Sequence, residues 1–165
     1  MKTFFRLVLF AALVAAGFWL WAFFFPSAEK VVHKRMASLA ETASFSAQAS
    51  NISRAAKALA FIGFFSDDAQ IIMDVPGLGT HSFSGRDEIR ETGNVIFAGL
   101  PGLNTTFLDA TVRIGADKKS AEASCTFRGR VGNDKDYGVE ELHFSWQQVD
   151  GVWLITRAET VKTLK

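Results

Sequence analysis

The chain has 165 residues, of which 48% are hydrophobic and 21% charged, and its formal net charge is +1 at pH 7. These values are ordinary for a globular protein, and the length suffices for one domain with its own core. Basic and acidic residues are interspersed along the chain, so the sequence lacks the basic stripe that nucleic-acid binding requires. No nucleic-acid partner is therefore expected.

The amino-terminal part of the sequence has the composition of a membrane span. Residues 7–25, LVLFAALVAAGFWLWAFFF, carry no charge and follow Lys2 and Arg6. A helix of this length, at about 1.5 Å per residue, spans the roughly 30 Å hydrocarbon core of a bilayer. The run ends in bulky residues, whereas the cleavage site of a signal peptide has small ones. We therefore expect residues 1–28 to form an uncleaved single-pass anchor that contacts the membrane through residues 7–25.

The basic head before a single apolar run is typical of an export signal. Lys30, Lys34 and Arg35 follow the run, so the basic residues on its two sides nearly balance and the orientation rests on the head alone. We expect residues 29–165 to form one domain outside the plasma (inner) membrane, facing the periplasm where the cell has one. The single Cys125 cannot form an intramolecular disulfide, so it does not indicate a compartment.

Three helices are expected in the domain. Apolar residues at helical spacing predict one helix over residues 29–45 and a second that Ser50 or Asn51 caps. Ser84 and Asp87 resemble a capping box at the start of the third. The apolar positions of the three helices are Val32, Met36, Leu39 and Ala43 in the first, Ile52, Ala56, Leu59 and Ile62 in the second, and Ile89, Ile96, Phe97 and Leu100 in the third.

The remaining segments predict strands. Residues 70–75 and 80–84 flank a Pro-Gly turn as a hairpin, and after residue 102 the apolar period changes to two. Four long antiparallel strands follow, the last two joined by Asp150-Gly151, a strong hairpin signal. The expected inward positions are Thr106, Leu108, Ala110, Val112 and Ile114, then Ala121, Ala123, Cys125, Phe127 and Val131, and then Leu142, Phe144 and Trp146. This order predicts an α+β fold in which a sheet wraps around helices.

Three segments resemble a known superfamily: FFSDDAQIIMDVPG (64–77), SGRDEIRE (84–91) and LHFSWQQVDGVWLI (142–155). In this order and spacing they resemble the nuclear transport factor 2-like superfamily, which includes SnoaL-like proteins, ketosteroid isomerase, scytalone dehydratase and limonene epoxide hydrolase. The resemblance covers residues 29–165. It implies three helices in a curved, mixed, mostly antiparallel sheet, an apolar pocket inside this cone, and often a homodimer through the outer sheet face. It does not imply an activity, because one fold hosts many functions.

Asp74 is the candidate catalytic residue, because the resemblance places it about where the isomerases carry their base. If Ile72 points inward, Asp74 lies at the pocket mouth as a general base, with His81 on the return strand as its partner. The alternative is an Asp that ends a strand and hydrogen-bonds the turn. Leu142 stands where the isomerase carries its acidic donor, and the only tyrosine, Tyr137, lies in a turn. Steroid isomerisation is therefore not expected, since developing charge would be uncompensated.

The expected pocket lining is apolar. It consists of Ile72, Leu108, Cys125, Phe127, Leu142, Phe144 and Trp146. Cys125 shares its face with no basic group, which favours a small core residue over a nucleophile. The histidines lack metal-ligand spacing and no Cys-x-x-Cys pair occurs, so neither a metal nor a cofactor is expected.

The opposite sheet face is polar. It carries Arg113, Glu122, Arg128, Arg130, Glu141, His143, Gln147, Arg157 and Glu159. This face is either a recognition or homodimer surface, or a solvated face with cross-strand ion pairs.

Three functions remain open. The first is a membrane-anchored, non-catalytic domain that binds a small apolar ligand or a protein partner. The second is an isomerase- or dehydratase-like enzyme acting on a small hydrophobic substrate, with Asp74 as base and His81 assisting. The third is a scaffold subunit of a cell-envelope complex. The incomplete catalytic set favours the first.

Overall fold

The computed structural model describes residues 27–75 and 79–161. The anchor expected over residues 7–25 lies outside the described residues, and so does the turn at 76–78. Within the two described ranges, no helix combines the length and the apolar character needed to cross a membrane.

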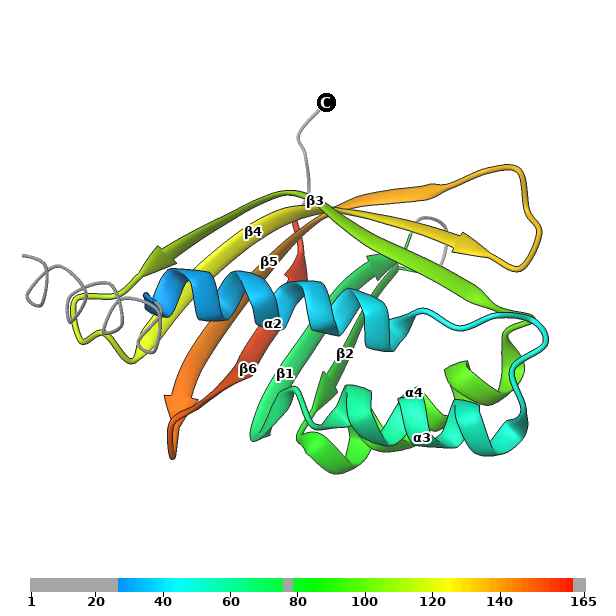
Figure 1. Cartoon of the computed structure of the whole chain (residues 1–165), viewed down its shortest axis with the longest axis horizontal. Coiled ribbons are helices and arrows are strands. Elements are labelled where there is room, and N and C mark those ends of the chain that lie inside the picture. Colours follow the sequence, from blue (N-terminus) through cyan, green and yellow to red (C-terminus); the bar gives the residue numbers. More distant parts are fainter. Residues whose placement is uncertain (1–26, 76–78, 162–165) are drawn as a thin grey trace, which may run out of the picture.

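A curved sheet of six strands holds one helix in its hollow, and two further helices pack together at one end (Figure 1). The described elements are α2 (Ala28–Ala43), α3 (Asn51–Ile62), β1 (Phe65–Val75), β2 (Gly79–Ser84), α4 (Arg86–Gly99), β3 (Leu103–Ile114), β4 (Ser120–Val131), β5 (Gly138–Val149) and β6 (Val152–Thr160). The strand order is β2-β1-β6-β5-β4-β3, and only the β1–β6 pair is parallel among these strands. This confirms the expected α+β architecture.

Helix α2 crosses the hollow of the sheet and supplies one side of the main core (Figure 1). Its N-cap is Ser27, whose side chain accepts a hydrogen bond from the Lys30 N–H. The predicted apolar face is confirmed, because Val32, Met36 and Leu39 are all buried. They pack in one cluster with side chains from the sheet, including Phe65, Phe144, Trp146 and Ile155.

Helix α3 begins after Ser50, one of the two expected caps. Its predicted apolar face is confirmed at Ile62, which is buried, and was wrong at Ile52, Ala56 and Leu59, which are exposed. Ile52 is 84% exposed and Leu59 is 68% exposed, whereas Ala58 is buried. Ala58 packs in a second cluster with Phe45 and Phe97, whose stacked rings lie 5.1 Å apart between centroids. The helix therefore contacts its neighbours through Ala58 and through Phe61 and Ile62 at its end.

The expected capping box at the start of α4 was wrong too. The N-cap is Gly85, at φ +84°, and no side chain caps the helix there. The Glu88 carboxylate instead accepts a hydrogen bond from the Ser84 N–H at 2.7 Å, and Asp87 pairs with Arg90. A residue with positive φ changes the chain direction at the helix start, so Ser84 does not reach the Asp87 N–H.

Strand β3 contains a bulge that moves its inward residues by one position. Its register to β4 shifts between Leu108 and Thr111, and Asp109 within this interval has φ +51°. Before the bulge Phe107 packs against the core and Leu108 is 36% exposed. The expected inward position of Leu108 was therefore wrong, since an extra residue in one strand reverses the alternation of its faces.

The alternation predicted for β4 and β5 is confirmed. Ala121, Ala123 and Cys125 on β4 are buried, as are Phe144 and Trp146 on β5. The hairpin from β5 to β6 turns at residues 150 and 151, both with positive φ, as a two-residue turn of this kind requires.

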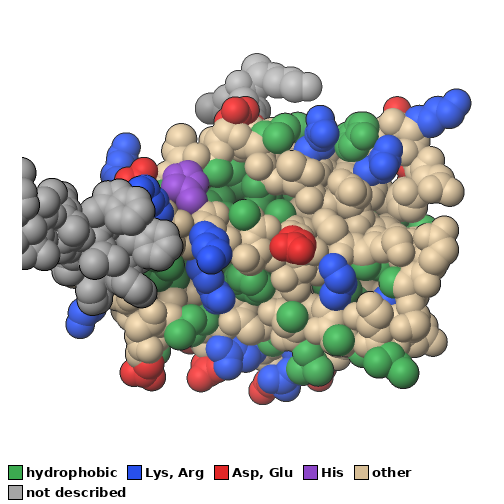
Figure 2. Space-filling view, viewed as in Figure 1, with side chains coloured by type: hydrophobic (Ala, Val, Ile, Leu, Met, Phe, Trp, Pro, Cys, Tyr) green, Lys and Arg blue, Asp and Glu red, His purple; other side chains and the backbone are tan. Residues whose placement is uncertain are grey.

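On the face of the molecule seen in Figure 2, acidic and basic side chains are interspersed over the surface.

Candidate functional site

A cavity of about 310 Å³ lies between the concave face of the sheet and the helices. Its helical wall comes from Leu39 and Ala43 near the end of α2, and from Gly93, Ile96 and Phe97 of α4. Small-molecule pockets in proteins have volumes of roughly 300–1,000 Å³. The cavity therefore has room for a small ligand.

The sheet wall of the cavity is almost entirely carbon. The residues that form it are Phe65, Ile71, Ile72, Met73, Leu103, Thr105, Phe107, Phe127, Leu142, Phe144, Ala158 and Glu159, with Phe61 from α3 beside them. The Phe107 ring lies 5.7 Å from that of Phe144 and 6.4 Å from that of Phe127, measured between centroids. Such walls favour an apolar occupant.

Glu159 is the one titratable residue among the described residues of the wall. Its carboxylate accepts hydrogen bonds from Arg157 Nε at 2.9 Å and Nη2 at 2.8 Å. Arg157 also donates to the side-chain oxygen of Gln70. Ala158 packs against the core, so alternation along β6 directs its neighbours Arg157 and Glu159 to the outer face. The carboxylate is therefore engaged in an ion pair outside the cavity.

Thr105 contributes a polar side chain to this wall. The residue is 8% exposed, and its Oγ1 has no hydrogen-bond partner among the described residues. Its backbone N–H donates to Ser44 Oγ at 2.9 Å, and the Ser44 hydroxyl donates to the Ala40 carbonyl at 2.8 Å. These bonds tie the end of α2 to β3 and fix the position of Thr105. A buried hydroxyl without a partner is costly and needs an explanation.

The structure brings four of the seven expected pocket residues to the cavity. Ile72, Phe127, Leu142 and Phe144 border it, whereas Cys125 and Trp146 are buried in the main core and Leu108 is on the outside. Sequence reasoning missed Thr105. The alternation that placed Leu108 inward also placed Thr106 inward, and it therefore placed Thr105 outward. It missed the part played by the third helix as well, although Phe97 was recognised as one of its apolar positions.

The hairpin register separates Asp74 from His81. Met73 pairs with His81 and Asp74 with Thr80, so the two candidate catalytic residues belong to opposite faces of the hairpin. Ile71 packs against the core, so alternation places Asp74 on the outer face. Ile72, between Ile71 and Met73, also borders the cavity.

Cys125 is buried in the main core. Burial, and to a smaller extent the nearby Glu141 carboxylate, raises the pKa of its thiol to about 12. The thiol is therefore neutral at physiological pH, which is the state of a core residue and not of a nucleophile.

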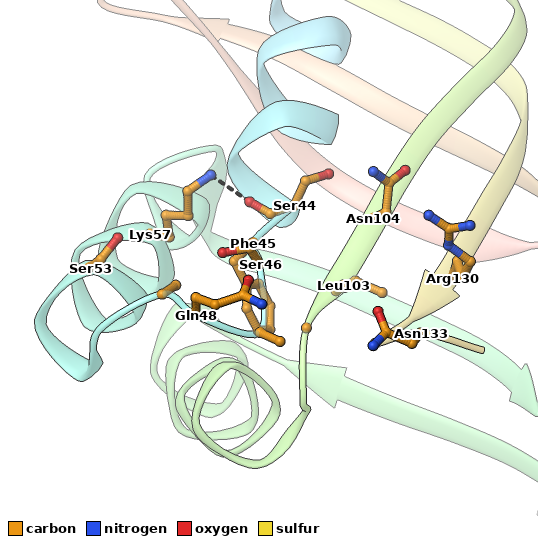
Figure 3. Close-up of a pocket in the computed structure, with 14 residues that line it drawn as sticks. Ser44, Phe45, Ser46, Gln48, Ser53, Lys57, Leu103, Asn104, Arg130 and Asn133 are labelled. Atoms are coloured by element: carbon orange, nitrogen blue, oxygen red, sulfur yellow. Dashed lines mark hydrogen bonds between the residues drawn. The ribbon is translucent and has the colours of Figure 1, made fainter.

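A second, polar groove of about 570 Å³ lies between the α2–α3 connection and the ends of β3 and β4 (Figure 3). Lys57 and Arg130 are the cations among its described residues. Lys57 Nζ donates to the carbonyls of Glu41 and Ser44 at the end of α2. Arg130 Nη1 donates to Tyr137 Oη at 3.3 Å. Lys57 thus holds the chain at the end of α2, whereas Arg130 contacts Tyr137 and has a buried Nε without a partner among the described residues. The apolar cavity, which is walled by both the sheet and the helices, is the stronger candidate site.

The outer sheet face carries a chain of polar contacts. His143 Nε2 lies 2.7 Å from Glu122 Oε2, and His143 Nδ1 lies 3.1 Å from Ser124 Oγ. Glu122 and Ser124 are exposed and His143 is half-buried. They stand on neighbouring strands, so they have the geometry of cross-strand pairs on a solvated face. No cluster of three or more potential metal ligands occurs in the part of the chain that the structure describes.

No protein-family model matches the chain, and no curated protein sequence matches it significantly. Solved structures do, among them three proteins of Novosphingobium aromaticivorans. A proposed aromatic ring hydroxylase has a TM-score of 0.62 and 17% identity, covering 83% of this chain and 90% of that one. A proposed scytalone dehydratase has a TM-score of 0.61 and 14% identity, covering 82% and 83%. An NTF2-like protein with a cystatin-like fold has a TM-score of 0.62 and 16% identity, covering 89% and 86%.

These likenesses show the fold. The chain has the nuclear transport factor 2-like, cystatin-like α+β fold, as the resemblance of its three segments implied. At identities of 14–17% they show the fold alone, and the activities in two of the names belong to those proteins.

Proposed function

We propose that this chain is a non-catalytic binding protein whose cone holds a small apolar ligand. The supporting observation is the cavity, whose walls are carbon except at Thr105 and whose bordering carboxylate, Glu159, is paired with Arg157. Burying apolar surface contributes about 25 cal/mol per Å². A ligand that fills the cavity therefore gains affinity without any charged contact.

An enzyme with Asp74 as base is the weaker candidate. Proton transfer requires a base within hydrogen-bond reach of the substrate. Alternation along β1 directs the Asp74 side chain away from the cavity, and the hairpin register puts His81 on the opposite face. The names of the hydroxylase and the dehydratase add only a shared fold.

Filling the cavity tests the binding function. We expect the full chain in detergent micelles to bind tetralin, a two-ring hydrocarbon, in isothermal titration calorimetry with empty micelles as the blank. Ala158 borders the cavity, so Ala158→Leu is expected to reduce this binding at least about tenfold by occupying the space. Ala60→Leu, on the exposed side of α3, is the matched control. Absence of binding to the unmodified chain, or equal binding by Ala158→Leu, would contradict the proposal.

We further propose that residues 7–25 anchor the domain in the plasma (inner) membrane, with residues 29–165 outside the cytoplasm. The support is the uncharged span-length run, which ends two residues before the N-cap of α2 at Ser27. The chain is expected to resist carbonate extraction, and a reporter fused after Lys165 is expected to be active only outside the cytoplasm. A cytoplasmic carboxy terminus would overturn this orientation.

A further inference from the structure

We propose that the occupant of the cavity is a neutral, apolar molecule with one hydrogen-bonding oxygen, such as a ketone, an alcohol or a phenol, and that Thr105 binds this oxygen. This inference rests on the proposed binding function and names the ligand class of the same site. It starts from Thr105. Among the described residues of the cavity wall, this is the one polar side chain that the alternation of the strand directs inward.

The Thr105 hydroxyl is buried without compensation. Thr105 is 8% exposed, its Oγ1 has no partner among the described residues, and its neighbours in the wall include Leu103 and Phe107. A hydroxyl in such a place has no hydrogen bond from the described protein atoms to replace those it makes in bulk water. A ligand oxygen in the cavity is the partner that restores this bond.

Among the residues that the structure describes, none supplies a hydrogen-bond partner for Thr105 Oγ1. Its own N–H is taken by Ser44, and the residue paired with it across the sheet is Gly129, which has no side chain. The hydroxyl and the methyl group of threonine are nearly equal in size, and the side chain has staggered positions about Cα–Cβ. Rotation about this bond therefore turns the hydroxyl toward the cavity without changing the volume that Thr105 occupies.

The charges around the cavity exclude an anionic ligand. No lysine, arginine or histidine occurs among its described lining residues, and the neighbouring carboxylate, Glu159, is already paired with Arg157. Moving an unpaired carboxylate from water to carbon walls is far costlier than moving a hydroxyl or a carbonyl. The ligand class therefore contains ketones, alcohols and phenols and leaves out fatty acids.

A matched set of ligands on one two-ring frame tests this inference. Tetralin, 2-tetralone and tetralin-2-carboxylate are titrated into the full chain in micelles by calorimetry, each against empty micelles. We expect 2-tetralone to bind about tenfold more tightly than tetralin, the effect of one hydrogen bond, and the carboxylate to bind most weakly. In Thr105→Val, which keeps the shape of the side chain, the ketone is expected to lose its advantage while tetralin binds as before.

Thr106→Val is the matched control, because Thr106 is the adjacent residue on the opposite face of β3. It is expected to keep the preference for the ketone. Thermal unfolding of ligand-free Thr105→Val checks the fold, and its melting temperature is expected to be at least that of the unmodified chain, since the uncompensated hydroxyl is gone.

The outcomes separate the two proposals. Equal binding of tetralin and 2-tetralone, an unchanged ketone preference in Thr105→Val, or tightest binding of the carboxylate would overturn the role of Thr105 and leave the binding function standing. Failure of all three ligands to bind the unmodified chain would overturn the binding function and this inference with it.

Discussion

Cys125 is a titratable side chain whose ionisation is linked to folding. Its thiol pKa is raised from an ordinary value of 9.0 to about 12, chiefly because the side chain is buried. The folded protein thus holds this proton more tightly than the unfolded chain does. The resulting stabilisation is present below pH 9 and is lost as the pH rises toward 12.

The first prediction concerns this alkaline range. Between pH 8 and pH 11 the free energy of unfolding is expected to fall more steeply for the unmodified chain than for Cys125→Ala, which has no thiol to ionise. Urea unfolding of both proteins at the two pH values measures the difference. The same slope in both proteins would show that burial of Cys125 does not set its pKa.

The second prediction concerns Asp74. The alternation of side chains along β1 directs its carboxylate away from the cavity. Asp74→Asn is expected to leave the dissociation constant of 2-tetralone unchanged within about twofold, because a neutral ligand in the cavity does not meet this carboxylate. Calorimetry measures it, with Thr105→Val as the positive control. A tenfold loss in Asp74→Asn would return this residue to the site and with it the enzyme hypothesis.

At the scale of a single element, β4 shapes the cavity through a glycine. The Phe127 ring lies over Gly129, so closely that a Cβ at residue 129 would overlap the ring. Gly129→Ala is therefore expected to push the ring into the cavity. We expect a loss of about 1–3 kcal/mol in the free energy of unfolding, together with weaker tetralin binding.

The neighbouring Gly138 on β5 is the matched control for Gly129. It pairs with Gly129, and a Cβ there would lie 3.8 Å from the Gly129 carbonyl oxygen, an ordinary contact. Urea unfolding and calorimetry of Gly129→Ala and Gly138→Ala compare the two sites. Equal effects would show that the position of the Phe127 ring does not depend on the absence of a side chain at Gly129.

At the scale of the whole molecule, the homodimer through the outer sheet face stays a prediction. Two copies related by a twofold axis bring the same patch of this face into contact, so that one residue of the first copy meets another residue of the second and the reverse contact also occurs. Ser145 lies on this face beside Glu122, whose carboxylate accepts its hydroxyl hydrogen bond at 3.0 Å. Ser145→Arg is expected to dissociate such a dimer, because a long side chain at residue 145 keeps the two faces from packing against each other.

Sedimentation equilibrium of the full chain measures this outcome. The unmodified protein and Ala60→Arg, whose substitution lies on the exposed side of α3, are expected to sediment as dimers, and Ser145→Arg as a monomer. A monomeric unmodified protein would contradict the dimer. The pair of Glu122 with His143 would then belong to a solvated face, where such pairs contribute little to stability.

The sequence by itself determined the order and the type of the elements. The helix over α2, a cap at Ser50 or Asn51, the alternation of β4 and β5 and the turn at Asp150-Gly151 were all predicted correctly, and the structure has the cap at Ser50. These features are local: a helical or a two-residue period, a capping side chain and a turn with positive φ each involve a few neighbouring residues. Together with the three segments that resemble the superfamily, they were sufficient for the fold.

Only the tertiary structure decided which faces meet and what lines the cavity. The bulge at Asp109 places Leu108 on the outside of the sheet. Helix α3 buries Ala58 against the rings of Phe45 and Phe97. Alternation along β1 puts Asp74 on the outer face. Each result depends on the side from which distant elements pack, and a periodic pattern does not contain this information. For the same reason Thr105, the polar residue in the wall of the cavity, was identified from the packed structure and not from the sequence.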